Sequence, residues 1–275
     1  MLRRRISLWA FALMGISLTA LVSMPAAASP MKPHSTACPA WQDDFNLTAL
    51  DSTRWVIASG QAPGYIPGYH IGYYNPSHVS VGGGYLTLTL TQSTGQVDSN
   101  SAGVVSQGAL IYTKFKCGYG TYQWTMRMSS TAASPTDPGG PVSGSVSAGF
   151  VYTNNSQTEI DFEFSGENPN SLYLVNWLNP NPQTNPTSSN ETYTALYPFD
   201  STSGFHTYQF VWQVGKISYF IDGILKAVHT TNVPSAPAYF MINHWGTDSG
   251  NWGGTATLGT TRYFYVNQVS YTPPQ

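Results

Sequence analysis

The hexapeptide Glu159-Ile160-Asp161-Phe162-Glu163-Phe164 decides the fold. Acidic and apolar residues alternate along it, and the side chains of a β-strand point alternately to opposite faces. As a strand, it would place Ile160, Phe162 and Phe164 in a core and three carboxylates in a row on the other face. The chain has only 13 acidic residues, so three within five positions are a marked concentration. Because like charges on one face repel, the pattern indicates a site that needs paired carboxylates.

Paired carboxylates at this spacing suit glycoside hydrolysis. That reaction uses two carboxyl groups, about 5–5.5 Å apart in retaining enzymes and about 6.5–9.5 Å apart in inverting enzymes. The Cα atoms of Glu159 and Glu163 would lie roughly 13 Å apart along a strand. Two Glu side chains that lean toward each other can close this gap, but distance alone does not choose between retention and inversion. The alternative is a solvated outer face, on which polar residues also alternate with apolar ones.

The hexapeptide resembles the signature of glycoside hydrolase family 16, in its Glu-x-Asp-x-Glu form. Bacterial lichenases (endo-β-1,3-1,4-glucanases), xyloglucan endotransglycosylases and fungal cell-wall transglycosylases carry this form. Residues 41–55, 118–128 and 205–223 are also similar to stretches of the family. The resemblance covers nearly all of residues 41–272. It implies an all-β fold, a β-jelly roll sandwich of two curved antiparallel sheets (concanavalin A-like), with the cleft on the concave face.

The resemblance also implies roles for individual residues. Glu159 matches the nucleophile, Glu163 the proton donor and acid/base, and Asp161 an assisting carboxylate between them. Three neighbouring carboxylates cannot all ionise at an ordinary pKa, and a raised pKa suits the acid that protonates the glycosidic oxygen. Substrate contacts are expected from aromatic and amide side chains of neighbouring strands and one loop: Phe150, Tyr152, Asn176, Trp177, Asn243, Trp245 and Trp252.

Two departures from the lichenases leave the substrate open. Gln157-Thr158 stands where lichenases carry a Trp-Asp pair, and 108–112 has apolar residues or Tyr where lichenases and many relatives carry Glu and Arg. We expect an endo-acting hydrolase that cleaves β-glucan of β-1,3 or β-1,3-1,4 type by retaining double displacement. The alternatives are a transglycosylase on β-glucan or xyloglucan, and a carbohydrate-binding jelly roll without activity.

The N-terminus reads as an export signal. Three arginines (3–5), an apolar run (6–22) and Ala26-Ala27-Ala28 are typical of a secretory signal peptide covering residues 1–28. A retained anchor helix is the alternative, because the apolar run is near spanning length. The product would be secreted, extracellular or periplasmic.

The remaining chain is predicted to be a flexible tail (29–40) followed by one catalytic domain (41–275). Cys38 and Cys117 could form one disulfide in an exported protein. Only 9% of residues are charged and the net charge is −2, so no basic patch suggests nucleic acid, whereas 14% aromatic residues suit a sugar-stacking surface. The expected partner is a polysaccharide, with no membrane contact after removal of the signal, and the protein is expected to be a monomer.

No cofactor is expected to be required. The six histidines show no metal-ligand spacing, so no metal site is predicted. A structural calcium is common in the family, but no ligands for it can be named from this sequence.

Short alternating segments between Gly/Pro-rich turns predict strands throughout and no helix outside the signal. A long loop over the cleft is expected at 59–84 and a polar turn at 92–101. Asp222-Gly223 is a strong hairpin signal. The expected strands are 85–91, 108–115, 118–128, 148–153, 159–164, 172–177, 205–214, 217–221, 224–228, 238–245 and 263–271.

Overall fold

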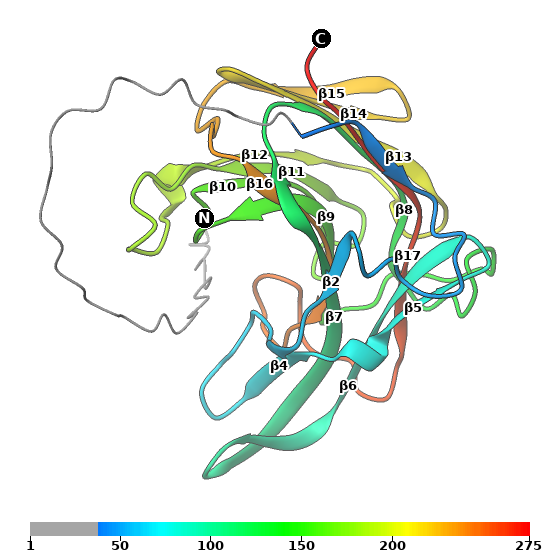
Figure 1. Cartoon of the computed structure of the whole chain (residues 1–275). Helices are drawn as coiled ribbons and strands as arrows, with labels where there is room; N and C mark the ends of the chain where they lie inside the picture. The colour runs from blue at the N-terminus through cyan, green and yellow to red at the C-terminus, as the bar shows by residue number, and fades with distance from the viewer. Residues whose placement is uncertain (1–37) are drawn as a thin grey trace, which may run out of the picture.

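The computed structural model describes residues 38–275. The predicted signal peptide (1–28) and residues 29–37 of the predicted tail lie outside the described residues. The described part contains strands joined by turns, together with two short 3-10 turns, η1 (Pro76–His78) and η2 (Ser188–Asn190). The strands form two sheets that pack face to face (Figure 1). The expected all-β jelly roll of antiparallel sheets is therefore confirmed.

We call one layer the back sheet. All its neighbouring strands pair antiparallel, and β1 (Trp41–Asp43) also pairs with β17. In spatial order it consists of β5 (Val79–Gly82), β6 (Tyr85–Asp98), β17 (Arg262–Thr272), β8 (Gly120–Ser130), β13 (His206–Gln213), β14 (Lys216–Ile221) and β15 (Ile224–His229).

We call the other layer the carboxylate sheet, because it contains the acidic hexapeptide. Its neighbouring strands are also antiparallel. In spatial order it consists of β12 (Glu191–Leu196), β11 (Leu172–Trp177), β10 (Thr158–Ser165), β9 (Ser145–Thr153), β16 (Ala238–Gly246), β7 (Ser101–Cys117) and β2 (Trp55–Ile57). β10 thus lies inside the sheet, with β9 on one side and β11 on the other.

The core between the sheets is built largely from aromatic side chains. Trp124 of the back sheet stacks on Phe240 of the carboxylate sheet, with ring centroids 4.3 Å apart. Phe162 of β10 contacts Tyr208 of β13 at 5.4 Å. All four side chains are almost completely buried. Burial of large aromatic side chains is a dominant stabilising term in a core of this kind, and it fixes which face of β10 points inward.

The outer part of the β6–β7 hairpin differs from the prediction. The polar segment 92–101 was expected to be a turn, but β6 runs on to Asp98 and β7 begins at Ser101. The hairpin therefore extends well beyond the two sheets, at the bottom of the view in Figure 1. The residues of its two strands pair across the hairpin, for example Thr94 with Val104. Backbone pairing within the hairpin keeps this segment in strand conformation although it has few large apolar side chains.

The predicted loop 59–84 is also more structured than expected. It contains β3 (Gly60–Gln61), β4 (His70–Tyr74) and β5. β4 pairs in parallel with the outer half of β7. Tyr74 is buried and packs into an apolar cluster on the open face of the carboxylate sheet, so this segment lies against one end of that face.

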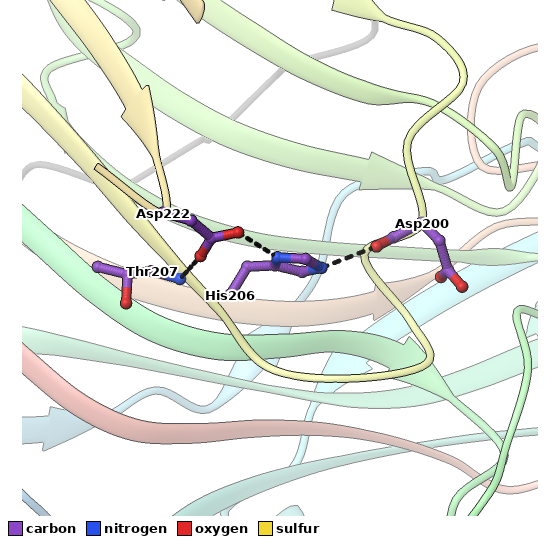
Figure 2. A network of polar contacts seen from close by, with 4 residues as sticks. All are labelled: Asp200, His206, Thr207 and Asp222. Atoms are coloured by element: carbon purple, nitrogen blue, oxygen red, sulfur yellow. Dashed lines mark hydrogen bonds and ion pairs between the residues drawn. The ribbon is translucent and has the colours of Figure 1, made fainter. Parts of the chain in front are cut away.

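The predicted hairpin at Asp222-Gly223 is present and is held by a polar network (Figure 2). Asp222 has a left-handed φ of 52°, and its carboxylate accepts the backbone N–H of Thr207 at 2.9 Å. The other carboxylate oxygen lies 2.6 Å from Nδ1 of His206, whose Nε2 contacts the carbonyl of Asp200 at 3.0 Å. Burial acts to raise the pKa of Asp222, but the hydrogen bonds from His206 and Thr207 outweigh it and hold the pKa below its ordinary value.

The predicted disulfide between Cys38 and Cys117 is present. It joins the segment before β1 to the last residue of β7, across a sequence separation of 79 residues. Residue 38 of the predicted flexible tail is therefore tied to the carboxylate sheet. Closing a loop of this length reduces the conformational entropy of the unfolded chain.

Candidate active site

The hexapeptide adopts the predicted alternation in β10. Ile160, Phe162 and Phe164 are completely buried in the core between the sheets. The carboxylates of Glu159, Asp161 and Glu163 therefore share the opposite, open face of the carboxylate sheet. Glu159 and Asp161 are buried there, whereas Glu163 is half-buried. A folded chain accepts this burial of carboxylates at a cost to stability, which is typical of a functional site.

The electrostatics of the triplet follow from its burial. Burial raises the pKa of Glu159 to about 7, aided by the charge of Glu191 and opposed by a hydrogen bond from Ser156. Burial also raises the pKa of Asp161 well above its ordinary value, with further contributions from the negative charges of Glu159, Glu163 and Glu191. These upward shifts of pKa favour the protonated forms of both groups and so reduce the negative charge on this face. The sequence analysis expected a raised pKa in at least one of the three carboxyls, and burial raises it in both Glu159 and Asp161.

Glu191 is a fourth carboxylate that the sequence analysis missed. It lies on β12 and pairs with Trp177, which in turn pairs with Glu159, so all three side chains share the open face. Its charge raises the pKa of both Glu159 and Asp161. Acidic residues are few in this chain, which has 13 of them, so each one was a possible site residue. The proximity of Glu191 to the triplet, however, depends on the order of the strands.

Ser156 contacts the triplet directly. Its hydroxyl donates to Oε2 of Glu159 at 2.5 Å, and the serine is buried in the turn between β9 and β10. The sequence analysis described this segment only as a short turn and did not single out the serine.

Six of the seven predicted substrate-contact residues lie on or beside the open face. Tyr152 pairs with Glu159 and Phe150 with Asp161 across β9 and β10. Trp177 pairs with Glu159 on the other side. Asn243 and Trp245 share a face with Met241 in β16. The ring of Trp252 lies 4.8 Å from that of Tyr173.

These six side chains differ in how accessible they are to a sugar. Trp245 is buried under the β3–β4 segment, where its ring contacts the position of Gly64. Asn243 is buried beside Tyr74, and its amide forms a hydrogen bond with that tyrosine. Burial raises the pKa of Tyr74, and the hydrogen bond only partly offsets this rise. The Oδ1 atom of Asn243 has no hydrogen-bond partner among the described residues and is free to accept one. Tyr152 and Trp252 are half-buried and expose part of their rings.

The prediction of Asn176 as a substrate contact is wrong. It pairs with Ile160 and so points to the opposite face from Trp177. Its Oδ1 lies 2.7 Å from Nδ1 of His229, and its Nδ2 donates to the carbonyls of Thr231 and Asn232. Asn176 is completely buried and serves the packing of β11 against the back sheet.

The open face continues beyond β16 as an apolar and aromatic surface. Leu110 and Tyr112 of β7, within the stretch 108–112 that departs from the lichenases, pair with Asn243 and Met241. The rings of Tyr112 and Tyr239 lie 5.7 Å apart, and Nζ of Lys116 sits 4.8 Å above the ring of Tyr239. The stretch that departs from the lichenases therefore lies on the same face as the carboxylates, separated from β10 by β9 and β16.

Other kinds of site receive no support from the described residues. Within 38–275, no cluster of three or more His, Cys, Asp or Glu side chains is arranged to hold a metal ion. In the same range, no helix has the length and hydropathy needed to cross a membrane. The residues gathered here, acidic at the centre and aromatic around it, suit acid/base and nucleophilic work on a sugar.

Comparisons with known proteins agree with this geometry. The sequence model described as "Glycosyl hydrolases family 16" matches residues 69–264. A β-glucanase of Paenibacillus macerans is 30% identical over 247 residues, which cover 83% of this chain and 97% of that protein.

Solved structures are similar as well. The β-glucanase of Bacillus licheniformis superposes with a TM-score of 0.67 at 25% identity, covering 86% of this chain and 99% of that one. The laminarinase catalytic domain of Thermotoga maritima gives the same TM-score of 0.67 at 18% identity, covering 86% of this chain and 97% of that one, and so supports the fold alone.

Proposed function

Because this chain belongs to family 16 of the glycosyl hydrolases, and is therefore a glycoside hydrolase, we propose that it is a secreted endo-acting enzyme that cleaves β-glucan with retention. The β-glucanases that it resembles support the polysaccharide class. Secretion is supported by the pattern of residues 1–28. The observation that carries the proposal is the row of carboxylates on the open face of β10, with aromatic side chains around it.

The proposed reaction has two displacements. The ionised carboxylate of Glu159 attacks the anomeric carbon while Glu163 gives its proton to the departing glycosidic oxygen. The bond from the anomeric carbon to that oxygen breaks, and a glycosyl ester on Glu159 forms. Glu163 then removes a proton from water, the water oxygen attacks the anomeric carbon, and Glu159 leaves as a carboxylate. Two inversions at one carbon give retention.

Asp161 assists by holding a proton between the two glutamates. Its raised pKa favours the neutral form, and Glu159 can then ionise beside it without facing another full charge. No metal or cofactor is needed for these steps, which use only carboxyl groups and water.

Product analysis tests this proposal. The purified protein and its Glu159→Gln variant would be incubated with mixed-linkage β-glucan, laminarin, xyloglucan, agarose and carrageenan. We expect oligosaccharides of the β-anomer from mixed-linkage β-glucan or laminarin, and a loss of at least about 10⁴-fold in the variant, because its amide cannot form the ester. Cleavage of neither β-glucan would overturn the substrate class, and activity that survives in Glu159→Gln would overturn the nucleophile. Products longer than the donor fragments would identify transfer to sugar in place of water.

A further inference from the structure

The turn that leads into β10 has an unusual backbone. Asn154, Asn155 and Ser156 follow one another with φ values of 46°, 51° and 59°. This left-handed region suits glycine and is tolerated by asparagine, but it is unfavourable for serine. Three such residues in succession without a glycine are rare, and strain of this kind persists only where surrounding contacts hold it.

The surrounding contacts are specific. The amide side chain of Asn155 donates to the carbonyls of Pro182 and Thr184, at 3.3 and 3.0 Å. Asn179 donates its backbone N–H to the carbonyl of Ser156 at 2.8 Å and its side-chain Nδ2 to the carbonyl of Asn155 at 2.9 Å. The loop after β11 therefore holds the turn through four hydrogen bonds.

This turn places the hydroxyl of Ser156 beside Glu159. Ser156 is only 1% exposed, and its hydroxyl donates to Oε2 of Glu159 at 2.5 Å. Glu159 is itself 5% exposed, so water reaches its carboxylate poorly. A buried carboxylate without a donor is costly, and a charge-assisted hydrogen bond is among the stronger polar contacts in a protein. In an ordinary right-handed turn, the side chain of residue 156 would point in another direction.

We propose that Ser156 is a positioning residue, held in a left-handed turn so that its hydroxyl fixes the orientation of the Glu159 carboxylate and supplies the hydrogen bond that its ionised form requires. This proposal rests on the assignment of Glu159 as the nucleophile. The alternative is that the turn only connects β9 to β10, with the contact to Glu159 as a by-product. The two differ in what happens when the hydroxyl is removed but the backbone conformation is kept.

Ser156→Gly is the decisive variant, because glycine removes the hydroxyl and adopts the left-handed conformation without strain. Asn154→Gly is its matched control, since Asn154 has the same backbone conformation but contacts only Gln157 with its side chain. Ser156→Thr restores a hydroxyl.

The titratable groups packed on this part of the sheet are Asp161 and Glu163 on β10, Tyr152 on β9, Glu191 on β12, Tyr219 on β14 and Lys116 on β7. All are unchanged in these variants, so a shift in the pH profile reports on the hydroxyl.

We expect Ser156→Gly to lower kcat by about 10–100-fold with little change in KM, the effect of losing a hydrogen bond to a charged group. The acidic limb of its kcat/KM profile should move to higher pH, because the pKa of Glu159 rises without the donor. Its Tm should be no lower than that of the wild type, Asn154→Gly should keep full activity, and Ser156→Thr should regain part of the loss. Wild-type kcat and pH profile in Ser156→Gly would overturn the proposal, and so would an equal loss in Asn154→Gly.

Failure of this inference is distinguishable from failure of the proposed function. If Glu159→Gln is inactive while Ser156→Gly behaves as the wild type, only the role of Ser156 is wrong. If Glu159→Gln stays active, the nucleophile assignment fails, and the role of Ser156 falls with it.

Discussion

Among single residues, Glu163 is the one whose proposed role depends most on the leaving group. In Glu163→Gln, kcat/KM on β-glucan should fall by about 10²–10⁴-fold, because a sugar alkoxide leaves poorly without a proton. An aryl β-glycoside of a glucan oligosaccharide with an acidic phenol leaves without protonation, so its cleavage to the glycosyl ester should be far less affected. Burst kinetics with the aryl substrate would measure this step. Glu159→Gln, tested in parallel, should lose both substrates, and an equal loss of both in Glu163→Gln would contradict the assignment.

Residue-level prediction from the sequence succeeded where one strand decided the outcome. The alternation of the hexapeptide was sufficient to predict which side chains face the core and which face the site. Asn176 was misplaced because it was taken together with Trp177, although adjacent residues of a strand point to opposite faces. Ser156 and Glu191 were missed for a different reason. The role of Ser156 depends on a left-handed turn, and that of Glu191 depends on the order of the strands. Neither feature can be predicted from the local alternation of apolar and polar residues.

At the scale of elements, the β14–β15 hairpin makes the contribution of one turn residue measurable. Asp222→Ala should lower the free energy of unfolding by about 1–2 kcal/mol, because alanine fits the left-handed conformation poorly and leaves the N–H of Thr207 without its acceptor. Asp222→Asn keeps both features and loses only the partly exposed ion pair with His206, so its cost should stay below about 1 kcal/mol. Urea denaturation at pH 7 would compare the two. Equal losses would show that the ion pair, and not the turn geometry, stabilises the hairpin.

The elements themselves were predicted unevenly. Strands that are buried on both faces, such as β11 and β16, were predicted close to their observed limits, because a short run of apolar residues between turns indicates a buried strand. The outer parts of β6 and β7 carry few large apolar side chains, and residues 92–101 were predicted as a turn. β4 was hidden in a segment rich in Gly, Pro and Tyr, since its strand conformation comes from pairing with β7, a partner distant in sequence.

For the whole molecule, the buried carboxyl of Glu159 links activity to stability. Its pKa is raised from 4.5 to about 7 by burial, so the folded protein holds a proton that the unfolded chain releases. Stability should therefore fall as pH rises from about 4.5 to 7, and the full cost should be present above pH 7. Glu159→Gln removes this cost and should be more stable than the wild type by about 1–3 kcal/mol at pH 7.5. Thermal unfolding followed between pH 4 and 8 would test this, with Glu167→Gln, an acidic residue outside the site, as control. A Tm difference between Glu159→Gln and wild type that is independent of pH would contradict the explanation.

The pairing of β1 with β17 has a topological consequence. Trp41 lies opposite Tyr271 in antiparallel register, so residue 38 and residue 275 leave the back sheet in the same region. The strand path of the described domain is therefore nearly a closed ring. A short peptide from residue 275 to residue 38 would complete the ring, and new ends could be cut elsewhere, for instance at the tip of the β6–β7 hairpin, which lies away from the carboxylates. We expect the fold to tolerate circular permutation at this hairpin, with β10 still in the interior of its sheet.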